Sequence, residues 1–187
     1  MKDAEATRER ILEAAMAEFA AYGIAGARVD RIARASAANK NSIYRYFDSK
    51  EQLFTAVLQR HLERVYTEVP FTPEDLPGFA VRFFDFAMSH PDLMRLMAWS
   101  GLERSAATPP ALTESMHGKL AALAAAQMRG TSERALPPAF LFTVITAIAS
   151  AWSAVNPVWM SIDPEALTDL PALRAGLASA VERLCAD

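Results

Sequence analysis

The chain has 187 residues, of which 52% are hydrophobic, and a formal net charge of −3 at pH 7. This length allows one large hydrophobic core, or a small domain joined to a larger one, and the charge excludes a protein that is basic throughout. The charged residues 1–5 lack the apolar core of a signal peptide, and the single cysteine, Cys185, can form no internal disulfide. We therefore expect a cytoplasmic protein.

The first helix is predicted over residues 5–22. Apolar side chains recur there at i, i+4 and i+8, which places them on one face. Gly23 follows as the expected left-handed terminator. A second, short helix fits 29–35, and residues 36–39 form a turn after it.

A third short helix is expected from residue 40 to about residue 46, with Asn39 as its N-cap. Ser49 and Gln52 have the spacing of a capping box, which opens a fourth helix that runs to about residue 68. Pro70 and Pro73 then mark a domain boundary.

Five further helices are predicted in the second half of the chain. The first is expected to use Thr72 as a cap and Pro73 as its first residue, and to end near His90. No stretch alternates with period two for long enough to form a strand, so the sequence predicts an all-α protein of about nine helices. The remaining four helices are expected at 92–101, 110–128, 138–155 and 171–184. The uncharged 138–155 is too short and too interrupted to span a membrane.

Two helices of about seven residues, joined by a four-residue turn and braced by a longer helix, predict a helix-turn-helix. This motif places its second helix in the major groove of DNA. That helix carries side chains that can contact base edges or phosphates. They are Lys40, Asn41, Ser42, Tyr44, Arg45 and Tyr46. The same pattern also fits an ordinary amphipathic helix, and helix-turn-helix geometry also occurs without DNA binding.

The distribution of charge also divides the chain into two parts. Basic residues predominate from 28 to 50, whereas acidic residues predominate after 64. This distribution suggests one face that binds an anion and a remainder with another task. We therefore expect a DNA-binding domain at 1–50, continued by the start of a connecting helix at 50–68, and a ligand-binding and dimerisation domain at 69–187.

The N-terminal third resembles the tetracycline-repressor (TetR) family of transcriptional regulators. The resemblance covers about residues 6–65 and is carried by Thr7–Ala15, Phe19, Tyr22, Gly23, Val29, Ile32, Ala33 and Asn39–Leu53. It implies that Lys40, Asn41, Tyr44, Arg45 and Tyr46 contact DNA and that Lys50 holds a phosphate. The chain departs from the family pattern twice. Ala37 stands where the turn usually has Gly, and Arg28 stands where the second helix usually opens with Thr. Arg28 cannot cap that helix, but it remains a candidate DNA-binding residue because its side chain can contact a phosphate.

The C-terminal domain is rich in aromatic and thioether side chains, a subset of which we expect to line a ligand cavity. The candidates for this pocket are Phe83, Phe86, Met94, Met97, Trp99, Met116, Phe142 and Trp152. The last two long helices are expected to pair with their copies in a homodimer. The candidates for that interface are Ala147, Ala151, Leu173, Leu177 and Val181.

No cofactor, metal site or enzymatic activity is expected. The histidines His61, His90 and His117 share no ligand spacing, and no catalytic set of residues has supporting context. Two hypotheses for the function remain. The chain is a repressor released from a palindromic operator on double-stranded DNA by a small apolar or aromatic effector, or a helical ligand-binding or adaptor protein that has lost operator binding.

Overall fold

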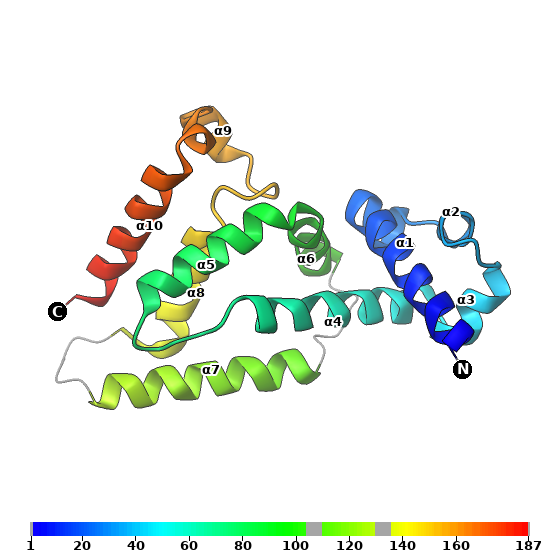
Figure 1. Cartoon of the computed structure of the whole chain (residues 1–187), viewed down its shortest axis with the longest axis horizontal. Helices are drawn as coiled ribbons and strands as arrows, with labels where there is room; N and C mark the ends of the chain where they lie inside the picture. The colour runs from blue at the N-terminus through cyan, green and yellow to red at the C-terminus, as the bar shows by residue number, and fades with distance from the viewer. Residues whose placement is uncertain (1, 104–109, 130–135, 187) are drawn as a thin grey trace. The chain divides into compact units, whose positions relative to one another are not determined.

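The computed structural model describes residues 2–103, 110–129 and 136–186. All regular structure in these ranges is helical, which confirms the all-α prediction (Figure 1). None of the described helices is long and apolar enough to cross a membrane. The chain divides into two compact units. Unit 1 comprises Met1–Glu63 and Asp92–Pro109, and unit 2 comprises Arg64–Pro91 and Pro110–Asp187.

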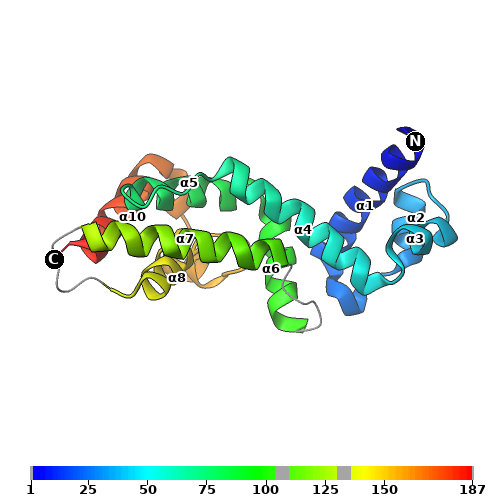
Figure 2. The same ribbon diagram turned by 90° about the horizontal axis from the view of Figure 1, so that it is seen from below.

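Unit 1 is built from α1 (Lys2–Gly26), α2 (Val29–Ala35), α3 (Lys40–Phe47), most of α4 (Lys50–Glu68) and α6 (Pro91–Glu103). Both views show α1, α2 and α3 gathered at the start of α4 (Figures 1 and 2). Their apolar faces meet in one core, in which the Phe19 and Phe54 rings contact edge to face at 5.1 Å. The other large side chains of this core include Ile11, Ile32, Ile43, Phe47 and Leu53.

The capping signals of the helix-turn-helix act as the sequence predicts, whereas Gly23 does not end the first helix. Gly23 has a φ of 66° and a ψ of −177°, so it breaks the helical geometry of α1, which nevertheless continues to Gly26. The Asn39 side chain accepts a hydrogen bond from the backbone N–H of Ser42 at 2.7 Å, and so caps α3. The Ser49 hydroxyl accepts from the backbone N–H of Gln52 at 3.1 Å at the start of α4.

Unit 2 contains α5 (Leu76–Ser89), α7 (Pro110–Arg129), α8 (Pro138–Ala149), α9 (Val158–Ile162) and α10 (Leu170–Cys185). Helix α5 packs against both α8 and α10, so it is the central helix of this unit. The fully or nearly fully buried side chains include Phe79, Phe84, Leu123, Leu141, Ile145, Leu177 and Val181.

Helix α5 begins later than predicted. Thr72 accepts a backbone hydrogen bond from Asp75 in a turn, and the helix starts at Leu76 instead of Pro73. The Asp75 carboxylate is the actual cap, because it accepts from the backbone N–H of Gly78 at 2.9 Å.

Helix α8 ends at Ala149, six residues earlier than predicted. The hydroxyls of Thr146 and Ser150 donate to carbonyls three and four residues back, a pattern that weakens regular helix. The chain then turns, and forms the short α9 and a 3₁₀ turn at Ala166–Thr168. The described residues therefore contain ten α-helices, in keeping with the prediction of about nine.

Candidate nucleic-acid interface

Helix α3 has one buried face and one exposed face. Ile43 and Phe47 are buried in the core of unit 1. On the opposite face Tyr44 is 38% exposed. The other exposed side chains of this helix are Lys40, Asn41 and Arg45, and Ser42 and Tyr46 are half-buried. The predicted DNA-contacting residues therefore lie on the accessible side of α3 or at its edge.

Two of these side chains have partners in unit 1. The Lys40 ammonium lies 3.1 Å from the carboxylate of Asp30 in α2, and both side chains are about half exposed. The Arg45 guanidinium lies over the Tyr46 ring, 5.5 Å from its centroid. A surface ion pair of this kind contributes little stability, so a phosphate can compete for Lys40.

Lys50, at the start of α4, donates a hydrogen bond to the backbone carbonyl of Ala27 at 3.3 Å. It therefore ties the first turn of α4 to the loop before α2. The resemblance implies a phosphate contact for this residue, and the positive end of α4 would support an anion there. The hydrogen bond to Ala27 is a further, stabilising contact of Lys50 that the sequence did not suggest.

Arg28 precedes α2 but does not cap it with its side chain. Instead Glu18 of α1 accepts from the Arg28 backbone N–H at 2.8 Å and from the Arg31 Nε at 2.7 Å. Burial alone would raise the pKa of Glu18, but the hydrogen bonds from Arg31 and Arg28 and their charges hold it below its ordinary value. Sequence reasoning missed Glu18, because a lone acid ten residues before its partner carries no local signal.

The predicted pocket residues fall into both units. In unit 1, Met94 is buried, Met97 is 37% exposed, and the Trp99 indole N–H donates to the carbonyl of Ala20 at 3.3 Å. Trp99 thus has a contact within unit 1 that the sequence did not predict.

In unit 2 the predicted pocket residues pack in separate places. Phe142 contacts the rings of Phe71 and Phe79 at 5.5 and 5.7 Å, and Phe83 lies 6.1 Å from Phe79. Trp152 meets Phe84 edge to face at 6.1 Å. The two remaining candidates are Phe86, which is buried, and Met116, which is half-buried.

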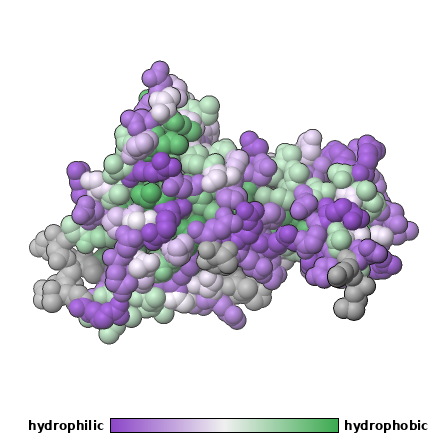
Figure 3. Space-filling view, viewed as in Figure 1, coloured by the Kyte–Doolittle hydropathy of each residue, from purple (hydrophilic) through white to green (hydrophobic). Residues whose placement is uncertain are grey.

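An open groove of about 890 Å³ lies among α8, α9 and α10. Trp152 of the predicted pocket lines it, and so do Ala151 and Leu173 of the predicted dimer interface. Apolar side chains gather at this end of unit 2 in Figure 3. Leu177 also borders the groove but is buried within the protomer, like Val181, whereas Ala147 is exposed.

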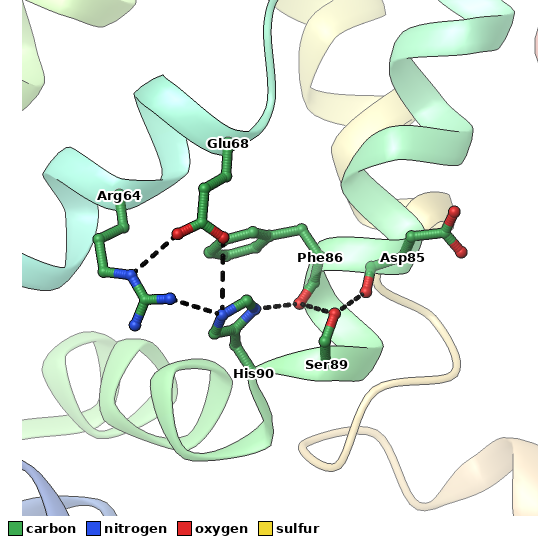
Figure 4. Close-up of polar contacts among 6 residues, drawn as sticks. All are labelled: Arg64, Glu68, Asp85, Phe86, Ser89 and His90. Atoms are coloured by element: carbon green, nitrogen blue, oxygen red, sulfur yellow. Dashed lines mark hydrogen bonds and ion pairs between the residues drawn. The ribbon is translucent and has the colours of Figure 1, made fainter.

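A cluster of polar side chains joins the end of α4 to the end of α5 (Figure 4). Arg64 donates through Nε to Glu68 at 3.0 Å and through Nη2 to His90 Nε2 at 3.1 Å. His90 Nδ1 lies 2.9 Å from the carbonyl oxygen of Phe86, which can only accept, so Nδ1 carries a proton. The Phe86 ring stacks on the imidazole with centroids 4.1 Å apart. His90 thus links the end of α4 to the end of α5 within unit 2.

The chain matches two family models. Residues 11–57 match "Bacterial regulatory proteins, tetR family", and residues 75–183 match "Tetracyclin repressor-like, C-terminal domain". The HTH-type transcriptional repressor SCO4008 of Streptomyces coelicolor is 42% identical over 159 residues, which cover 83% of this chain and 82% of the relative. The HTH-type transcriptional repressor NicS of Pseudomonas putida is 31% identical over 111 residues, which cover 55% of this chain and 52% of the relative.

A solved structure agrees with these sequence matches. The crystal structure of a protein described as a transcriptional regulator, SCO4942 from Streptomyces coelicolor, has 38% sequence identity and a TM-score of 0.82, and the match covers 96% of this chain and 98% of that one. The exposed face of α3, the capped helix-turn-helix and both family matches lead to one conclusion. The chain belongs to the TetR family of helix-turn-helix transcriptional regulators.

Proposed function

We propose that this regulator is a repressor that binds a palindromic operator as a homodimer and leaves it when a small apolar or aromatic effector binds. The observation that carries the proposal is the exposed face of α3, which presents Asn41, Tyr44 and Arg45 while Ile43 on the opposite face is buried in the core. An amide, a phenol and a guanidinium on one accessible helix face can read base edges and hold phosphates.

The dimer is supported by the outer faces of α8 and α10. Ala147 of α8 and Ala172, Gly176 and Ala180 of α10 are exposed and small, so two copies can bring these helices close together. An isologous dimer of this kind has two-fold symmetry. Two α3 helices would then meet two half-sites about one helical turn, or roughly 10 bp, or more apart.

The effector class is supported by the lining of the open groove among α8, α9 and α10. Trp152 and Trp159 offer aromatic surfaces there, and Ile148 and Leu173 offer aliphatic ones. Such a lining favours an apolar or aromatic molecule over a sugar phosphate. An effector releases the operator only if it binds the DNA-incompetent state more tightly.

Fluorescence anisotropy with DNA from the region flanking the chain's own gene tests the proposal. We expect Arg45→Ala to weaken binding about tenfold or more and to reduce the salt dependence by about two units of slope, roughly one for each protomer. Asn41→Ala should instead relax the preference at one base pair of each half-site. Arg129→Ala removes one exposed arginine of α7, away from both α3 and the proposed dimer interface, and is the matched control, which should bind like the wild type.

The same assay tests release. Apolar aromatic compounds that raise the melting temperature of the free protein should also dissociate the labelled operator, and both effects should saturate at the same concentration. If Asn41→Ala and Arg45→Ala both bind as the wild type does, α3 is not the DNA-reading surface. A wild type that binds no DNA, but does bind such compounds, favours the adaptor hypothesis.

A further inference from the structure

The first helix is broken at one residue in the middle of unit 1. Gly23 has a φ of 66° and a ψ of −177°, so the backbone leaves helical geometry there. In an uninterrupted helix the backbone N–H of Ile24 would donate to the carbonyl of Ala20, four residues earlier. The break separates this donor from this acceptor, and both then need other partners.

Two side chains of α6 supply those partners. The Trp99 indole N–H donates to the Ala20 carbonyl at 3.3 Å. The Glu103 carboxylate accepts from the Ile24 N–H at 2.9 Å and from the next backbone N–H, of Ala25, at 3.2 Å. Trp99 and Glu103 are four residues apart and so lie on one face of α6. That single face therefore satisfies both ends of the broken hydrogen bond.

The fit depends on the glycine itself. A Cβ at position 23 would collide with the Glu103 carboxylate and would lie 2.8 Å from the Trp99 ring. The positive φ also disfavours any side chain at this position. Gly23 thus makes the break and at the same time leaves room for the two α6 side chains that fill it.

Helix α6 is also a segment by which the chain passes between the units. Its first residue, Pro91, is the last residue of the unit 2 segment Arg64–Pro91, and the rest of the helix belongs to unit 1. The residue before it, His90, is held by Arg64 and Phe86 within unit 2 (Figure 4). Helix α6 therefore continues the chain directly from unit 2, whereas Trp99 and Glu103 hold its other end to α1 within unit 1.

We propose that Trp99 and Glu103 form a latch that positions the DNA-binding domain of each protomer for operator binding. The inference rests on the proposed function as a dimeric, operator-binding regulator. The latch residues act through α1. A dimer gains affinity from its second domain only if that domain is held where the second half-site lies, because orientation sets its effective concentration. Loss of the Trp99 and Glu103 contacts should therefore lower the affinity gained from the second domain, while α3 itself remains intact.

The test compares two DNA probes with full-length protein. One probe carries the complete palindromic operator, located by footprinting the wild type on its own flanking DNA, and the other carries the same DNA with one half-site scrambled. We expect Glu103→Ala to bind the complete operator about tenfold more weakly and the single half-site unchanged. Trp99→Phe, which keeps the ring but loses the N–H, should show the same pattern more weakly.

Three further measurements separate positioning from damage to the fold. The Ile24 and Ala25 amides should exchange hydrogen faster in Glu103→Ala than in the wild type. Glu103→Gln retains one acceptor oxygen and should restore most of the operator affinity. Glu13→Ala removes an exposed acid from α1 and should leave both probes unaffected.

The outcomes that overturn the latch differ from those that overturn the proposed function. If Glu103→Ala binds the complete operator as tightly as the wild type does, or loses affinity equally for both probes, the latch does not position the domain. Unchanged exchange at Ile24 and Ala25 also refutes it. A wild type that binds neither probe refutes operator binding itself, and the latch proposal with it.

Discussion

Ala37 occupies a left-handed position in the turn between α2 and α3, with a φ of 51°. The resemblance to the family already marks this position, because glycine usually fills it. An L-residue with a side chain pays about 1 kcal/mol for this conformation. We predict that Ala37→Gly raises the free energy of unfolding by up to about 1 kcal/mol, measured by urea unfolding. Ala17→Gly, at an exposed position inside α1, should lower it by about 1 kcal/mol. Destabilisation by Ala37→Gly would contradict this account.

Glu18 is the most buried charged side chain among the described residues, with 9% of its surface exposed. Its pKa is raised by burial but lowered more by its hydrogen bonds with Arg31 and the Arg28 backbone, so its net pKa lies below the ordinary 4.5. A depressed pKa in the folded state means that the carboxylate contributes stability above about pH 4.5, and that this contribution is lost as the pH falls through the lowered value.

We therefore predict that Glu18→Gln is less stable than the wild type at pH 7, by about 2 kcal/mol, because two charge-assisted hydrogen bonds are weakened or lost. The difference should shrink as the pH falls below 4.5, since the wild-type carboxyl then becomes neutral as well. Urea unfolding at several pH values between 7 and 3 measures this. Glu13→Gln, at an exposed position of the same helix, is the control. A difference that stays constant with pH would show that Glu18 acts by packing instead of charge.

At the scale of helices, local chemistry explains which boundaries could be predicted. The limits of α2 and the start of α3 agree with the sequence prediction, because Asn39 and the turn before it carry short-range capping signals. The end of α8 could not be predicted in the same way. Hydrophobicity continues past Ala149, whereas the hydroxyl contacts of Thr146 and Ser150 that accompany its end depend on side-chain geometry.

The site shows the same division between local and distant signals. The exposed face of α3 follows from helical periodicity, so Lys40, Asn41, Tyr44 and Arg45 could be named from the sequence. Glu103 could not, because its partners Ile24 and Ala25 are nearly 80 residues away in the chain. Periodicity places a residue on a face of its own helix but does not tell which other helix that face meets.

At the scale of the whole molecule, dimerisation decides whether two α3 helices act together. Ala147 lies on the exposed side of α8, and its substitution should therefore cost the single protomer little. If α8 and α10 pair with their copies, Ala147→Glu places two uncompensated charges in a desolvated interface. We predict that this variant sediments as a monomer at micromolar concentration and binds the complete operator at least tenfold more weakly than the wild type.

Ala125→Glu provides the matched control, because Ala125 is an exposed alanine in α7, away from the proposed interface. It adds the same charge to unit 2 and should remain dimeric, with unchanged affinity for the operator. Circular dichroism must show the same helix content for both variants, so that loss of the dimer is not confused with unfolding. A wild type that sediments as a monomer at micromolar concentration would refute the homodimer, whereas an Ala147→Glu variant that stays dimeric would move the interface away from α8. The exposed small residues of α10, Gly176 and Ala180, would then have to be explained without a partner copy.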